Sequence, residues 1–151
     1  MAPPQRHPGN QGVLRYLAQG GDPAQVAVAV APDDVDTWRL GAHPDVVEWL
    51  WARLNGVLPA DARFLVGDTA ALVDPSSGLI VALALGTQYA LRLGPRALGE
   101  ARDAGYATLH EFTTVGRTLD LPATFGTGWV FGRHDAREAG WLAETVAGAN
   151  R

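Results

Sequence analysis

The stretch Thr69-Ala-Ala-Leu-Val-Asp-Pro-Ser-Ser-Gly-Leu-Ile-Val-Ala-Leu-Ala-Leu-Gly-Thr-Gln-Tyr-Ala-Leu-Arg-Leu93 decides the fold of this chain. It contains three apolar runs separated by two turn signals, at residues 74–78 and 86–88. In the first turn, proline fixes φ, serine and aspartate side chains can bond to the local backbone, and glycine permits a positive φ. This pattern predicts a three-stranded antiparallel meander at the centre of a sheet.

The middle run, residues 79–85, is apolar at every position, which is typical of a strand that is covered on both faces. In the last run the side chains of Tyr89 and Arg92 are expected on opposite faces of the strand. A single buried helix over residues 79–93 is the alternative interpretation. Gly86 and the β-branched residues of this stretch favour strands instead.

Periodicity and turn residues predict further elements on either side of the meander. Helices are expected at residues 13–19, 44–55, 95–104 and from 135 to about 148, and strands at residues 24–31, 62–66, 106–112, 117–121 and 129–132. We therefore expect an α+β fold, with an antiparallel sheet of about five to seven strands and helices packed on one face. A chain of 151 residues is long enough for one domain with a substantial core.

The domain organisation follows from a change in composition near residue 12. Residues 1–12 are rich in proline, glycine and glutamine and are expected to form a flexible N-terminal tail. Residues 13–151 are expected to form the single α+β domain.

Composition and charge argue against several classes of function. The net charge of −4 counts against nucleic acid as a partner, because phosphate binding needs a basic face. The chain has no cysteine, so disulfides, thiolate zinc sites and cysteine nucleophiles are absent from it. The chain contains twelve arginines and no lysine. This bacterial-like composition indicates a GC-rich genome. Neither a signal peptide nor an apolar run of membrane-spanning length is recognisable, and we expect a cytoplasmic protein without membrane contact.

A ligand site is one hypothesis for the polar residues near the predicted sheet. His110, Arg117, Trp129 and Arg92 could line a pocket in which histidine acts as a base and arginine holds a carboxylate or phosphate. A structural histidine and solvated arginines are the alternative interpretation. The four histidines lack metal-ligand spacing, so we expect no metal and no cofactor, and we assign no catalytic residue.

Surplus aromatic residues provide a second hypothesis, a surface for a protein partner. Trp49 and Trp141 lie off the apolar stripes expected for their helices, and Phe125 and Phe131 flank a Gly-Thr-Gly turn. These four side chains could form a contact surface. Packing in or beside the core is the alternative interpretation.

The C-terminal part of the chain resembles known α+β families. From Tyr89 onward it has a strand, a helix ending in Ala104-Gly105, a strand bearing His110, a Gly128-Trp129-Val130 strand and a final helix. This pattern is similar to the uncharacterised families of the YjbR/MmcQ type and to the luciferase-domain proteins of unknown function. The resemblance implies a sheet backed by helices, with a tryptophan-containing strand before the last helix. Where the YjbR type has a basic Lys/Arg-His-Trp run, this chain has Thr-Gly-Trp, so the resemblance does not imply DNA binding here.

Two functions follow from these observations. No catalytic constellation is recognisable, which favours a non-catalytic protein-interaction or self-associating module without excluding an enzyme. The alternative is a small-molecule-binding protein or enzyme with a pocket around His110, Arg117 and Trp129. We expect a protein partner or a homo-oligomer in the first case and a small ligand in the second.

Overall fold

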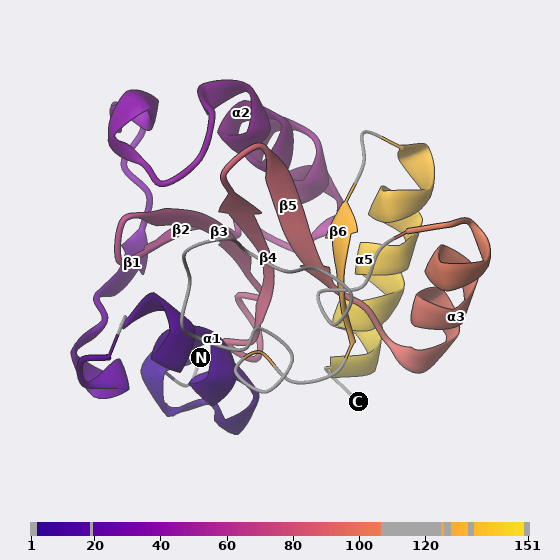
Figure 1. The fold of residues 1–151 in the computed structure, drawn as a ribbon, viewed down its shortest axis with the longest axis horizontal. Coiled ribbons are helices and arrows are strands. Elements are labelled where there is room, and N and C mark those ends of the chain that lie inside the picture. The colour runs from indigo at the N-terminus through magenta and orange to yellow at the C-terminus, as the bar shows by residue number, and fades with distance from the viewer. Residues whose placement is uncertain (1–2, 19, 107–124, 126–127, 133–134, 150–151) are drawn as a thin grey trace.

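A computed structural model of the chain describes residues 3–18, 20–106, 125, 128–132 and 135–149. Within these residues, six strands form one antiparallel sheet whose spatial order is the order along the chain (Figure 1). The strands are β1 (Val28–Val30), β2 (Arg63–Val66), β3 (Thr69–Val73), β4 (Ile80–Leu85), β5 (Gln88–Arg92) and β6 (Trp129–Gly132). The predicted α+β class and antiparallel sheet are therefore confirmed.

The central meander is the β3–β4–β5 unit, as the sequence predicts. The first turn is organised by Asp74, whose carboxylate accepts hydrogen bonds from the Ser76 N–H (3.0 Å) and the Ser77 hydroxyl (2.8 Å). Gly78 and Gly86 both have positive φ, of 80° and 60°, which a residue with a side chain rarely adopts. All but the last residue of β4 are buried, because helices lie over both faces of the sheet.

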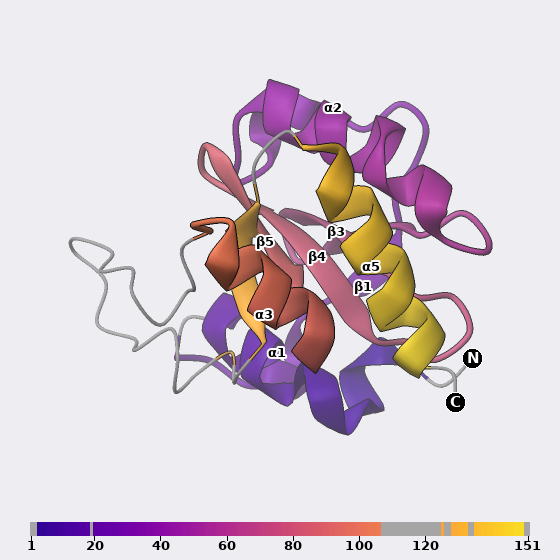
Figure 2. The same ribbon diagram turned by 90° about the vertical axis from the view of Figure 1, so that its right-hand side faces the viewer.

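Four α-helices lie among the described residues. They are α1 (Gln11–Leu17), α2 (Pro44–Ala52), α3 (Pro95–Asp103) and α5 (Ala136–Ala149). Short 3₁₀ helices are η1 (Pro4–Arg6), η2 (Pro8–Asn10), η3 (Pro23–Gln25), η4 (Thr37–Arg39) and η5 (Leu54–Val57). The helices α2, α3 and α5 share one face of the sheet, as expected, whereas α1 packs on the opposite face (Figure 2).

The core is consequently divided by the sheet into two clusters. The larger cluster joins α2, α3 and α5 to side chains such as Leu72 and Leu91. The smaller cluster joins Val13, Leu14 and Tyr16 of α1 to the other side of the same strands. Alternation along the strands directs most neighbouring side chains into different clusters, with an exception at Val81 and Ala82 of β4, where the pairing with β3 shifts register. Both faces of the sheet therefore stabilise the fold.

The expected flexible tail is wrong for residues 3–12, which pack against the sheet; residues 1 and 2 lie outside the described residues. Asn10 is fully buried. Its amide donates hydrogen bonds to the carbonyl oxygens of Pro4 (2.9 Å) and Gly78 (2.8 Å), and its Oδ1 accepts one from the N–H of Ile80 (2.8 Å). The prolines that indicated a loop instead begin two 3₁₀ turns, which bring Asn10 to the start of β4.

The end of the chain agrees with the prediction where it is described. Strand β6 pairs with β5, and α5 follows Asp135, whose carboxylate accepts a hydrogen bond from the N–H of Arg137 (3.0 Å). Most of the predicted strand at 106–112 and all of the strand at 117–121 lie outside the described residues.

Candidate functional site

Two of the four predicted ligand residues, Arg92 and Trp129, are cross-strand partners in β5 and β6. The guanidinium carbon of Arg92 lies 4.8 Å from the centroid of the Trp129 ring. Its Nε donates to the carbonyl of Ile80 (2.9 Å) and its Nη2 to that of Gly9 (2.8 Å). Burial lowers the pKa of Arg92 to about 10, and the side chain still remains charged at neutral pH. Arg92 therefore connects β5 and β4 to the N-terminal segment.

The other two predicted ligand residues, His110 and Arg117, lie outside the described residues. Of the four predicted ligand residues, the structure therefore brings together Arg92 and Trp129. Within the described part of the chain, no group of three histidine, cysteine or acidic side chains is arranged to hold a metal ion.

The aromatic residues proposed as a partner surface do not share one exposed surface. Phe125, Phe131 and Trp141 are only 4%, 8% and 6% exposed. Phe125 and Phe131 belong to the α1 side of the core, whereas Trp141 belongs to the other side and donates its Nε1–H to Glu100 Oε2 (2.8 Å). Trp49 is half-buried beside the core, with the Arg53 guanidinium 4.5 Å from its ring centroid. Because helices cover both faces of the sheet, large aromatic side chains fill the space between helices and sheet. This packing explains why these aromatic residues are buried.

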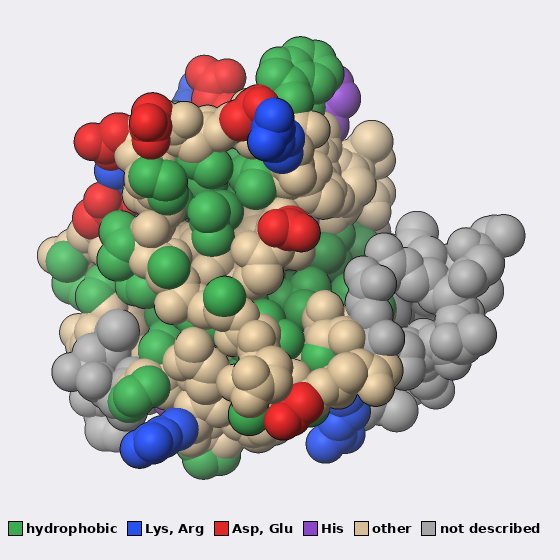
Figure 3. Space-filling view, turned by 90° about the vertical axis from the view of Figure 1, so that its left-hand side faces the viewer, with side chains coloured by type: hydrophobic (Ala, Val, Ile, Leu, Met, Phe, Trp, Pro, Cys, Tyr) green, Lys and Arg blue, Asp and Glu red, His purple; other side chains and the backbone are tan. Residues whose placement is uncertain are grey.

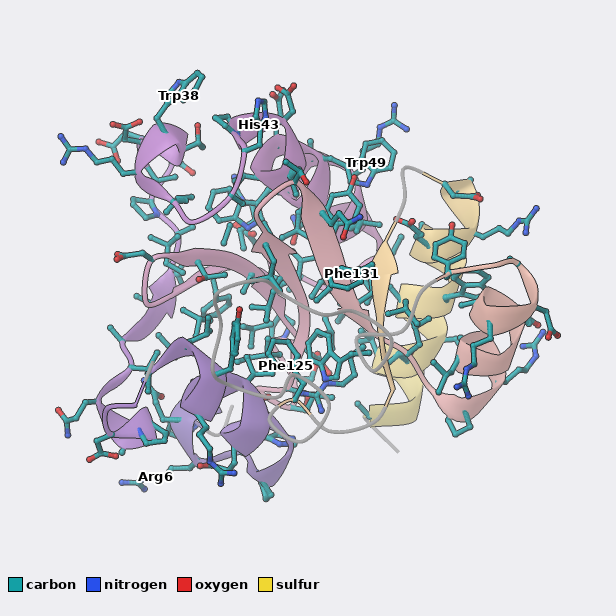
Figure 4. The ribbon with its side chains drawn as sticks, in the orientation of Figure 1. Arg6, Trp38, His43, Trp49, Phe125 and Phe131 are labelled. Carbon is teal, nitrogen blue, oxygen red and sulfur yellow. The ribbon has the colours of Figure 1, made fainter. Side chains whose placement is uncertain are left out.

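The large hydrophobic side chains that are exposed lie elsewhere, near the β1 end of the sheet. Among the described residues these are Val30, 63% exposed, and Trp38, 78% exposed. Figure 4 shows Trp38 pointing away from the body of the molecule, whereas Phe125 and Phe131 lie within it. We define the β1 surface as the open edge of β1 together with Trp38 and the groove described below.

Strand β1 is an edge strand with a single neighbour among the described residues, β2. The carbonyl of Ala27 accepts a hydrogen bond from Gly67 (2.7 Å), and the N–H of Ala31 donates to Arg63 (3.0 Å). Residues that bond to the same neighbour alternate along an antiparallel strand. The N–H and C=O groups of Val28 and Val30 are therefore directed away from β2, toward the open edge.

The two faces of β1 differ in the size of their side chains. Val28 and Val30 pair with Val66 and Phe64, and so share the α1 face of the sheet. Ala29 and Ala31 lie on the α2 face, where they leave room above the strand. A chain running beside β1 would thus meet valines on one face and alanines on the other.

Contacts with Asp36 and His43 hold Trp38 in place. The carboxylate of Asp36 accepts a hydrogen bond from the N–H of Trp38 (3.1 Å), which caps η4. The Trp38 ring lies 6.4 Å, centroid to centroid, from that of His43, whose backbone N–H donates to the carbonyl of Gly86 (2.7 Å). The loop that carries this exposed ring is thus attached to the β4–β5 turn.

A groove of about 300 Å³ lies between α2 and the end of the β1–β2 pair, and we call it the α2 groove. It is lined by Ala31, Pro32, Asp33, Val35, Thr37, Pro44, Val47, Glu48, Trp51, Ala52 and Arg63. The walls are mainly apolar, and the indole of Trp51 is fixed by a hydrogen bond to the carbonyl of Ala71 (3.1 Å). This volume is at the lower end of the range for ligand pockets, so the groove suits a side chain rather than a large molecule.

The charges at this groove are predominantly acidic. The side chain of Arg63 donates two hydrogen bonds to Asp61, of 3.0 and 2.9 Å, and its backbone N–H donates a third of 3.1 Å. These bonds lower the pKa of Asp61 to about 2. The positive charge of Arg63 is therefore largely balanced locally. The carboxylate of Asp33 is 95% exposed and lies 3.6 Å from Arg63. Glu48 is exposed on the α2 side of the groove.

The acidic character extends over the whole segment around the groove. Residues 31–63 contain six carboxylates and three arginines, a net charge of −3, when the entire chain carries −4. Figure 3, which faces this side of the molecule, shows acidic side chains around a group of hydrophobic ones. A partner for this surface would need apolar and basic groups.

Comparison of the chain with protein-family models, with curated proteins and with solved structures gives no match. The resemblance to the YjbR/MmcQ type and the luciferase-domain proteins therefore stays a prediction. No helix in the described part of the chain is long and apolar enough to cross a membrane.

Val30 and Trp38 were not among the functional candidates expected from the sequence. The available signal is that Trp38 follows an acidic, turn-like stretch, residues 32–36. Val30, by contrast, looks like any strand residue. Its exposure depends on β1 being the last strand of the sheet, which depends on the order of strands in space.

Proposed function

We propose that this protein is a non-catalytic interaction module that binds a partner by adding the partner's extended segment to β1. The observation that carries this proposal is the open edge itself, where the backbone groups of Val28 and Val30 face away from β2. Unpaired backbone donors and acceptors at a sheet edge bind extended peptides, and side-chain contacts then provide specificity.

Exposed apolar side chains beside the edge support the same proposal. Val30 lies on the strand, and Trp38 lies on the adjoining η4 turn. Tryptophan contributes a large amphipathic contact area and is enriched at binding hot spots. In water the exposed Trp38 ring contributes no buried apolar surface to the stability of the fold, whereas a docked segment would cover it.

The test uses a short peptide of alternating threonine and valine, compared in two N-methylated forms. If the valines pair with Val28 and Val30, methylation of the valine nitrogens removes the inter-strand hydrogen bonds, and methylation of the threonine nitrogens leaves them intact. We expect the peptide to shift the amide NMR signals of Val28 and Val30, and only valine methylation to abolish the shift. Equal binding of both methylated peptides would contradict strand addition.

A matched pair of protein variants provides the second part of the test. Val30→Pro removes the outward N–H, and proline is tolerated on an edge strand when its nitrogen faces solvent. Val30→Thr retains both the N–H and the β-branched shape. We expect peptide binding to be lost in the proline variant and kept in the threonine variant, with similar urea unfolding midpoints. Binding that persists in Val30→Pro would count against the proposal.

A small-molecule site around His110, Arg117 and Trp129 is the second candidate. The observation in its favour is that Trp129 Nε1 is buried beside the Arg92 guanidinium and has no hydrogen-bond partner among the described residues. Native mass spectrometry of protein purified gently from its own host would reveal a retained ligand. Trp129→Phe removes the N–H and keeps the ring, so a retained mass that this variant does not lose would contradict the site.

A further inference from the structure

Resting on strand addition at β1, we propose further that the added segment is cationic and places an arginine or lysine side chain in the α2 groove. This assigns the groove a ligand class, a basic side chain presented by an extended protein segment.

Register determines which side chains of an added strand reach the groove. Side chains directly opposite each other on neighbouring strands lie on the same face of a sheet. A residue opposite Ala29 or Ala31 therefore points to the α2 face, where the groove begins at Ala31. Residues opposite Val28 or Val30 point to the other face and meet exposed valine. The matching partner sequence alternates basic and apolar residues.

Shape determines what kind of side chain fits. Ala29 of β1 and Ala31 just after it have small side chains. The apolar walls of the groove are formed by Ala52, Val47 and Pro44. Long basic side chains bury their methylene stems along apolar surface and keep the charged group near water. The groove combines these apolar walls with two exposed carboxylates in its lining, Asp33 and Glu48, and so meets both requirements.

The charged residues around the groove determine whether a cationic or an anionic ligand is favoured. Asp33 and Glu48 border the groove from its two sides, the first on the loop after β1 and the second on α2. The one arginine in the lining, Arg63, is paired with Asp61 at 2.9 Å. Arg63 also lies 3.6 Å from Asp33, so one arginine is shared between two carboxylates. An incoming guanidinium or ammonium group thus meets an excess of carboxylates at the groove.

The same charges disfavour a second copy of the chain as the occupant. Each copy would bring its own net charge of −3 over residues 31–63 to the shared edge. Like charges that face each other make the free energy of association less favourable, whereas a basic segment is attracted by the same acidic surface. The acidic surroundings therefore select against self-pairing and for a cationic partner.

The experiment compares three peptides that share alternating valines and carry arginine, threonine or glutamate between them. Fluorescence anisotropy measures their binding to the full chain and to Glu48→Gln and Asp33→Asn variants. Asp103→Asn, on α3, is the control because it makes the same charge change away from the groove. We expect arginine to bind tighter than threonine by about fivefold at low salt, glutamate to bind weakest, and the arginine preference to fall in the two groove variants only.

Each contrary result has a distinct meaning. Equal binding of the arginine and threonine peptides would overturn the cationic ligand and leave strand addition standing. An arginine preference that falls equally in Asp103→Asn would overturn the assignment to the groove. Self-association that Val30→Pro abolishes would make a second copy the occupant and overturn the cationic partner. Failure of all three peptides to bind would overturn strand addition itself and this assignment with it.

Discussion

The N–H of Ile80 donates a hydrogen bond of 2.8 Å to the side chain of Asn10, a residue 70 positions earlier in the chain. The same side chain donates to Pro4 and Gly78, so one buried amide satisfies three backbone groups. Asn10 thereby replaces a neighbouring strand at the start of β4. This contact makes residues 3–10 part of the folded structure.

Replacing Asn10 tests that role. Asn10→Ala would remove the hydrogen bonds that the side chain makes to Gly78 and Ile80 in a buried site, whereas the Pro4 carbonyl would keep the His7 N–H (3.3 Å). We expect a loss of about 3 kcal/mol in the free energy of unfolding. Urea denaturation measures the loss. The control is Gln11→Ala, because Gln11 is exposed and bonds to the carbonyl of Gln5 at the surface; its effect should stay within about 0.5 kcal/mol. A loss below about 1 kcal/mol in Asn10→Ala would contradict a structural role for this residue.

A comparison of two tryptophans separates the core from the β1 surface. Trp141→Ala removes a buried ring and its hydrogen bond to Glu100, and should destabilise the fold by about 3–5 kcal/mol. Trp38→Ala removes an exposed ring and should change stability by no more than about 0.5 kcal/mol while weakening peptide binding. Thermal unfolding and anisotropy measure both effects. Large destabilisation by Trp38→Ala would show that its ring supports the fold instead.

Gly132 illustrates a position where the absence of a side chain is a packing requirement. A methyl group at this residue would lie 2.5 Å from Tyr89 Cδ2 and 3.0 Å from Leu91 Cδ1. Gly132→Ala should therefore cost about 1–3 kcal/mol, because the Tyr89 ring must move within a filled core. Gly140→Ala is the matched control: nothing lies within 4 Å of its added methyl group, and the change should stabilise α5 by about 0.5–1 kcal/mol. Calorimetry that ranks the two variants in the opposite order would refute this explanation.

The pair formed by Asp61 and Arg63 predicts a pH dependence. Hydrogen bonds from Arg63 lower the pKa of Asp61 from 3.8 to about 2, so the folded state favours the ionised carboxylate. Its contribution is present above about pH 4 and is lost as the pH falls toward about pH 2. Both side chains are partly exposed, so the contribution should be below about 1 kcal/mol. Asp61→Asn should thus be less stable than the wild type at neutral pH, and the difference should disappear near pH 2. A difference that does not change with pH would exclude this mechanism.

Local signals explain why much of the fold could be predicted from the sequence. The meander depends on turn residues such as Pro75 and Gly78, which act within a few positions of themselves. Helix α2 begins at Pro44, where the missing N–H of proline has no intrahelical partner in any case. Such signals need no knowledge of distant residues.

The interactions that could not be predicted are those between distant parts of the chain. The Pro- and Gly-rich surroundings of Asn10 indicate a loop, and its partners in the β3–β4 turn leave no local trace. Phe131 and Trp141 look like surplus aromatics until α1 and α5 are seen on opposite faces of the sheet. The exposure of Val30 likewise follows from strand order. His110 and Arg117 stay predictions, since they lie outside the described residues.

The chain order of the strands has a consequence for synthesis on the ribosome. Because each strand pairs with the one made just before it, β1 to β5 can assemble as they emerge, without waiting for a distant segment. The amino terminus behaves differently. Asn10 is made early but finds Gly78 and Ile80 only after more than half of the chain has been translated. Until then the segment that carries Asn10 lacks its partners at the start of β4, so it completes its docking late, onto strands made after it.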